Sequence, residues 1–397
     1  MVPVTRNRGR RSGRLALAAV GTIAALGLAG CSLGGEEEAE EPATETTETV
    51  DAAPLLEEAL ADLADYPALT ATGQIAASVG ADVQETDLTV ADGGATRGTF
   101  QVNGAEAEVL AADSKLFLRA QEEFWLDRSV FGPDSGAFEG NWVRSSPRHA
   151  GLNPSSTLAP PALAEILGGM ELEDDQAVEE NLDGTRTHRI SLAGERNQLW
   201  IDAETGQIVR IAIEELVPEG AETGPQVRLD LAEVDQTGAE ELYTGLTTVV
   251  EEGLTDSRDV RIEVAWQGEA GMTCDEGPSC TWSGTVHDAG TEGSGTVLVR
   301  MDVTFTNEEL GTKECSESGS LEAGGTLELS CGVDYDVTST DAEEYSVDAD
   351  AILSTRGLSG DQQQEMLAAL AEQREATLSG GEEEGVGEGT EEDEGGQ

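Results

Sequence analysis

The spacing of apolar residues changes along the chain and predicts mixed structure. Leu56, Leu60 and Leu63 recur at helical spacing, and Pro67 ends that pattern. Residues 86–127 then alternate between apolar and polar positions, with Gly, Asn and Asp turns, which predicts short antiparallel strands. A second helical stripe in residues 160–170 stops at two consecutive glycines. The first half of the chain is therefore expected to be α+β.

Residues 197–216 predict a hairpin about Glu204-Thr205-Gly206, in which Leu199 and Ile201 share one face. The returning strand is expected to place Val209, Ile211 and Ile213 together, and residues 225–234 repeat the alternation. An antiparallel sheet with one apolar face needs a cover. The two predicted helices are the candidates for that cover.

Farther along, five segments with turn residues between them predict a small β-sandwich: 260–268, 279–288, 295–307, 325–337 and 344–353. This region also holds four cysteines, which allow three pairings. We favour the sequential one, Cys274–Cys280 with Cys315–Cys331. Disulfides are expected here because they persist in exported domains. A four-thiolate zinc site is disfavoured because the Cys-x-x-Cys form is missing.

Residues 359–378 predict a C-terminal helix, because Ser359 and Gln362 are spaced as a capping box. The segment after it, residues 380–397, is dominated by Glu and Gly and is expected to be disordered.

The N-terminus has the order of an export signal. Five arginines precede an apolar run from Leu15 to Gly30, which is shorter than the roughly 20 residues of a spanning helix. Residues 28–31, Leu-Ala-Gly-Cys, are similar to the lipobox of bacterial lipoproteins, whose cysteine carries a diacylglyceryl group. We therefore expect cleavage before Cys31, lipidation of its sulfur, and anchorage at the extracytoplasmic face of the cell membrane. An ordinary secreted protein with a chance cysteine is the alternative.

Charge narrows the class of partner. The chain has 22 Lys+Arg and 80 Asp+Glu; loss of residues 1–30 removes five arginines and no acid, which leaves a net charge of −63. A nucleic-acid partner is excluded by this balance, since it requires a basic footprint. Residues 31–53 are rich in Glu and poor in large apolar side chains, so they are expected to be an extended tether.

No catalytic pattern emerges from the sequence. The three histidines, His149, His188 and His287, lack a second ligand at metal spacing, and His188 is expected to be a half-buried strand residue. Ser146 and His149 could form a pair in Ser-Ser-Pro-Arg-His, but residues so close in sequence rarely face each other, and no orienting acid is implied. We expect no enzyme activity, no metal site and no cofactor other than a lipid ligand.

Several of these segments together resemble a known family. The N-terminal helix, the "LNPSS" stretch before the second helix and the "WIDAETGQI" hairpin are similar to the LppX/LprAFG family of actinobacterial lipoproteins, within the LolA-like lipid carriers. The resemblance covers about residues 54–250. It implies an antiparallel half-barrel with helices over its concave face. The disulfide-bearing all-β, Ig-like sandwich that we expect after the half-barrel is an addition that the family lacks.

The resemblance also implies a function, the binding or carrying of an acylated lipid or glycolipid in an apolar cavity. The side chains expected to line that cavity are Phe100, Val102, Val109, Leu118, Trp125, Trp142, Leu163, Ile166, Leu167, Leu199, Ile201, Val209, Ile211 and Ile213. The alternative is a scaffold or envelope-sensing lipoprotein whose sandwich recognises a protein or cell-wall partner. The expected organisation is signal 1–30, tether 31–53, lipid-binding domain 54–250, sandwich 256–357, helix 358–379 and tail 380–397.

Overall fold

The computed structural model describes residues 49–130, 135–275, 277–291, 293–337 and 344–380. The predicted signal, Cys31 and most of the predicted tether lie outside the described residues, as does the acidic segment after residue 380. Within the described residues no helix is long and apolar enough to cross a membrane. The described residues belong to one compact unit.

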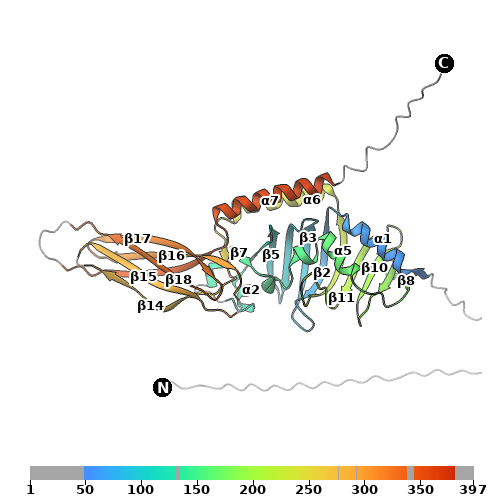
Figure 1. Cartoon of the computed structure of the whole chain (residues 1–397), viewed down its shortest axis with the longest axis horizontal. Helices are drawn as coiled ribbons and strands as arrows, with labels where there is room; N and C mark the ends of the chain where they lie inside the picture. Colours follow the sequence, from blue (N-terminus) through green and yellow to red (C-terminus); the bar gives the residue numbers. More distant parts are fainter. Residues whose placement is uncertain (1–48, 131–134, 276, 292, 338–343, 381–397) are drawn as a thin grey trace, which may run out of the picture. The chain divides into compact units, whose positions relative to one another are not determined.

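A 13-stranded sheet forms the first part of this unit (Figure 1). Adjacent strands in this sheet are antiparallel, except for the parallel pair β7–β13. Two sequential runs, β8 to β12 and β2 to β7, meet where β12 pairs with β2. The strands are β1 Thr49–Asp51, β2 Ala68–Ala76, β3 Val83–Ala91, β4 Thr96–Val102, β5 Ala105–Ala112, β6 Lys115–Ala120, β7 Trp142–Ser145, β8 Gln176–Leu182, β9 Thr185–Ser191, β10 Gln198–Asp202, β11 Ile208–Ile213, β12 Gln226–Val234 and β13 Arg258–Asp259.

Helices cover both faces of this sheet. The two predicted helices, α1 (Ala52–Ala64) and α5 (Pro160–Gly168), pack against one apolar cluster with Phe100, Leu118 and Ile211. On the other face, α6 (Gln236–Gly253) and α7 (Gly360–Ser379) share a second cluster. The short helices are α2 Glu122–Asp127, η1 Ser135–Ala137, α3 Pro147–Ala150 and α4 Pro154–Thr157.

The sequence analysis missed α6. Its signals are Asp235, whose side chain accepts a hydrogen bond from the Gly238 amide at 2.8 Å, and the helical spacing of Leu242, Leu246 and Val250. Because the sheet has an apolar cluster on each of its two faces, each face needs a cover, and the predicted pair of helices covers only one.

Helix α7 confirms the predicted capping box. The Ser359 Oγ accepts from the Gln362 amide, and the Gln362 side chain accepts from the Ser359 amide, both at 3.2 Å. The structure adds what spacing could not show: Met366 and Leu370 of α7 are buried with Tyr243 and Leu246 of α6. The chain therefore leaves the sheet after β13, builds the sandwich, and returns to α6 with α7 (Figure 1).

Loss of the cap should be measurable. Ser359→Ala is expected to lower the free energy of unfolding by about 1 kcal/mol, because the Gln362 amide loses its acceptor. Ser359→Asp should keep most of the stability, since aspartate also caps helices. Urea unfolding of both variants tests this, and equal losses would contradict a capping role.

The sandwich consists of two three-stranded sheets around one apolar core, β14-β15-β18 and β17-β16-β19. Its strands are β14 Val264–Cys274, β15 Ser279–Asp288, β16 Thr296–Asn307, β17 Gly311–Glu322, β18 Thr326–Asp334 and β19 Asp348–Arg356. Five were expected from the sequence. The missed strand, β17, is mostly polar, and only Leu321 on it is fully buried. The immunoglobulin arrangement itself stays a prediction.

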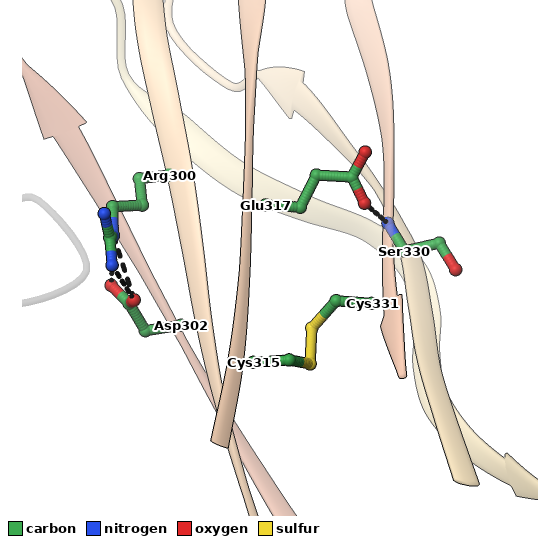
Figure 2. Close-up of a disulfide and its surroundings, with 6 residues drawn as sticks. All are labelled: Arg300, Asp302, Cys315, Glu317, Ser330 and Cys331. Carbon is green, nitrogen blue, oxygen red and sulfur yellow. Dashed lines mark hydrogen bonds and ion pairs between the residues drawn. A yellow bond between two sulfur atoms is a disulfide. The ribbon is translucent and has the colours of Figure 1, made fainter. Parts of the chain in front are cut away.

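Both disulfides have the predicted pairing. Cys274 and Cys280 face each other across β14 and β15, and Cys315 and Cys331 join β17 to β18. Since β17 and β18 belong to different sheets, the second disulfide links the two layers (Figure 2).

Candidate functional site: a pocket where the sheet meets the sandwich

The predicted lipid contacts form a packed cluster. Twelve of the fourteen side chains belong to the α1/α5 cluster or pack against it, and several, Phe100, Leu118 and Ile211 among them, have no exposed surface. Four pockets stand out in the described residues, and only Ile213 of the predicted side chains borders one of them. The lipid-binding role of these residues stays a prediction.

Two of the fourteen residues lie elsewhere. Trp142 is buried on the α6 side, under the guanidinium of Arg119 at 4.8 Å, because strand alternation sends Val143 to the α1/α5 cluster instead. Val209 is half-buried and unpaired in a β-bulge: Trp200 faces Arg210, and Ile201 faces Ile208. Ile208 therefore takes the core position that was expected for Val209.

An open apolar groove of about 490 Å³ lies between α1 and α5. Leu60, Ala164 and Met170 are among its lining residues, and Glu57 is its one charged side chain. None of the predicted cavity-lining residues lines this groove, although Leu163, Ile166 and Leu167 of the second helix were expected at the mouth of the cavity.

A pocket lined by both charged and apolar side chains lies where the sheet meets the sandwich, and we call it the junction pocket. Its volume is about 460 Å³, within the range of ligand sites. Residues from α2, η1 and α3 form one side, and β13, the start of β14 and β19 form the other. Its lining residues are Asp127, Arg128, Ser129, Val130, Ala137, Phe138, Arg148, His149, Arg258, Asp259, Val260, Arg261, Ile262, Glu263, Val264, Gly290, Thr291, Gly293, Leu353, Ser354 and Thr355.

Backbone pairing holds the two sides of the pocket together. Strand β13 pairs with β7, and the Asp259 amide donates to Thr355 Oγ1 on β19 at 2.9 Å. The Arg144 guanidinium donates from Nη1 to the Gly357 carbonyl at 3.2 Å. The sheet and the sandwich are therefore joined by hydrogen bonds at this point, rather than by a linker alone.

A buried ion pair lies beneath this junction. Asp259 has 1% of its side chain exposed, and the Arg261 guanidinium donates to both of its carboxylate oxygens, at 2.7 Å from Nη2 to Oδ2. Burial raises the pKa of the Asp259 carboxyl, and the arginine offsets part of that effect.

On the opposite side Arg128 binds α3. Its Nε donates to the His149 carbonyl at 2.6 Å, its Nη2 donates to Gln84 Oε1 at 3.2 Å, and its guanidinium lies 3.6 Å from the Phe124 ring centroid. Burial lowers the pKa of Arg128 to about 10, so it remains a cation at neutral pH.

Ser146 and His149 do face each other, which corrects the expectation from their spacing. Ser146 caps α3, and its Oγ lies 3.3 Å from His149 Nδ1. The other ring nitrogen, Nε2, faces Arg148 at 3.3 Å instead of a carboxylate, so the geometry is not that of a nucleophilic triad. The described residues also contain no group of three or more His, Cys, Asp or Glu that could hold a metal.

Comparisons with known proteins add little to this description. No family model matches the chain, and a search of curated proteins finds no match. Among solved structures, LprF from Mycobacterium bovis aligns over 45% of this chain and 90% of its own, with 14% identity and a TM-score of 0.29. MucB in complex with MucA(peri) aligns over 71% and 93%, with 14% identity and a TM-score of 0.23. Likeness at these scores carries no argument about fold or function.

Proposed function

We propose that this chain is a non-catalytic lipoprotein of the cell envelope, anchored through Cys31, that binds an acylated lipid or glycolipid in the junction pocket. The observation that carries the proposal is the apolar wall of that pocket. Phe138, Val260, Ile262 and Leu353 line it, and each is at least nine-tenths buried. The transfer of an acyl chain from water to such a surface is favourable by about 0.8 kcal/mol of free energy per CH₂.

The pocket suits a molecule with two kinds of surface. Beside the apolar wall stand arginines and backbone groups, so a ligand with both an acyl chain and a polar head could contact the two at once. A tether that begins at Cys31 would also keep the pocket near bilayer lipid and so raise its effective concentration.

Lipid that co-purifies with the protein tests the proposal. Residues 31–397 with Cys31→Ser, made in a bacterial host, are expected to carry acylated lipid in native mass spectrometry. Ser354→Trp, a half-buried position in the junction pocket, should reduce the lipid-bound fraction at least tenfold. Leu60→Trp, the matched change in the α1/α5 groove, should leave it unchanged.

The reverse pattern would place the lipid between the helices and overturn the junction pocket as its site. Bare protein in every variant would overturn lipid binding altogether.

A tethered adaptor is the second candidate, and the packing of the predicted cavity residues supports it. Such a protein would use the sandwich to bind an envelope partner. Removal of residues 256–379 is unsuitable as a test, because it would also remove α7 and uncover Tyr243 and Leu246. Pull-downs should instead compare the full chain with substitutions on the exposed face of the sandwich, such as Ile352→Lys. Equal partner recovery by both forms would argue against this role for that face.

A further inference from the structure

Positive charge is concentrated in the junction pocket. Four of the 17 cations after residue 30 line it, Arg128, Arg148, Arg258 and Arg261, whereas only three of the 80 acids do, Asp127, Asp259 and Glu263. In the chain as a whole acids outnumber cations several-fold. The pocket therefore differs in sign from the rest of the molecule.

The partners of these arginines decide what the charge can do. Arg261 is neutralised by Asp259, and Arg128 is engaged by the His149 carbonyl and Gln84. Arg258 differs: its Nε and Nη1 are buried, and neither has a hydrogen-bond partner among the described residues. Buried donors without an acceptor are costly, so a shift of the guanidinium that lets a ligand in the pocket supply an acceptor would be stabilising.

The nearby carboxylates cannot easily fill that role. Asp256 and Asp302 act on Arg258 electrostatically, but Asp256 pairs with Arg356 at 3.3 Å and Asp302 pairs with Arg300 at 2.7 Å (Figure 2). Each carboxylate is thus already held by another arginine. The Arg258 guanidinium is left as a partly buried cation on the wall of a pocket of ligand size.

We propose that the junction pocket recognises an anionic group, a phosphate or a carboxylate, through Arg258. A guanidinium presents donors in a planar fork that fits the oxygens of either group. The proposal rests on the proposed function for its acyl portion and adds the chemistry of the head. The anion has two possible sources, the headgroup of a lipid or a free ion such as inorganic phosphate.

Long-range repulsion by the net charge does not prevent such binding. At physiological ionic strength the interaction of exposed charges is screened beyond about 8 Å. A group inside the pocket therefore interacts mainly with the charges that line the pocket and with those close behind it, such as Asp256 and Asp302.

Monomeric short-chain lipids test the proposal without a membrane surface. Calorimetry on residues 31–397 with Cys31→Ser would compare dihexanoyl-phosphatidylglycerol, dihexanoyl-phosphatidylcholine and inorganic phosphate. Phosphatidylglycerol is expected to bind about tenfold more tightly than phosphatidylcholine, and phosphate is expected to compete with it. Arg258→Gln should abolish that preference and leave phosphatidylcholine binding unchanged. Arg258→Lys should retain part of it, and Arg374→Gln, on an exposed arginine of α7 that is paired with Glu240, should retain all of it.

The outcomes separate this proposal from the proposed function. Equal affinity of the wild-type chain for the two lipids overturns anion recognition and leaves lipid binding in place. Phosphate binding that requires Arg258, without binding of either lipid, supports anion recognition from a free source and overturns the lipid proposal. Binding of none of the three probes overturns both. The wild-type comparison remains decisive even if Arg258→Gln fails to fold.

Discussion

Asp259→Asn is expected to lower the free energy of unfolding by about 3–5 kcal/mol, the usual cost of breaking a buried ion pair from one side. The substitution keeps the shape of the side chain but removes its charge. Arg261, with 14% of its side chain exposed, would then lack a counter-ion, and Arg144 nearby would add to the excess of positive charge. The backbone amide of Asp259 also donates to Thr355 Oγ1, so the uncompensated charge of Arg261 would lie at the contact between sheet and sandwich and should loosen it.

The chain supplies a matched control. Arg300 and Asp302 are likewise two residues apart on a strand and paired at 2.7 Å, but 37% and 47% of their side chains are exposed (Figure 2). Asp302→Asn should therefore cost less than about 1 kcal/mol. Guanidinium unfolding of both variants measures the difference. Similar small losses would show that the Asp259 pair contributes little to stability.

Acidification is expected to destabilise the fold through His149. Burial, followed by the charges of Arg148 and Arg128, lowers its pKa from 6.5 to about 4. The unfolded chain therefore binds more protons than the folded chain between these pH values, so stability falls as the pH drops through this window. The contribution of His149 to the free energy of unfolding is fully present above pH 6.5, and roughly 3 kcal/mol of this free energy is lost by pH 4.

Comparison with a variant isolates this effect from the many carboxylates. His149→Asn removes the titrating ring, so the difference in unfolding free energy between wild type and variant should shrink between pH 6.5 and pH 4. Thr157→Val, at a buried position without a titrating group, serves as the control and should give a difference that is nearly constant. A constant difference for His149→Asn as well would show that its ring titrates normally.

Local patterns in the sequence predicted many of the elements. Alternation predicted the strands around Phe100 and Val227, helical spacing predicted α1 and α5, and the Ser359–Gln362 spacing predicted the cap of α7. These features depend on residues within a few positions of each other. The sequential disulfides were predicted too, and they also join cysteines that are near in the chain.

Errors arose where one residue shifts a pattern or where polar residues form a strand. The bulge at Val209 moved Ile208 into the core, and polar β17 carried too little alternation to be detected. Trp142 was assigned to the wrong face, although its neighbour Val143 must point the opposite way.

By itself the sequence determined the secondary structure of the periodic segments, the acidic charge and the order of basic, apolar and acidic residues at the N-terminus. Only the tertiary structure decided that α7 returns to α6 and that Asp259, Arg128 and Arg258 line one pocket. The physical reason is range: periodicity reports which way a side chain points from its own strand or helix. Which distant segments meet depends on how whole apolar faces pack together, and no local pattern carries that information.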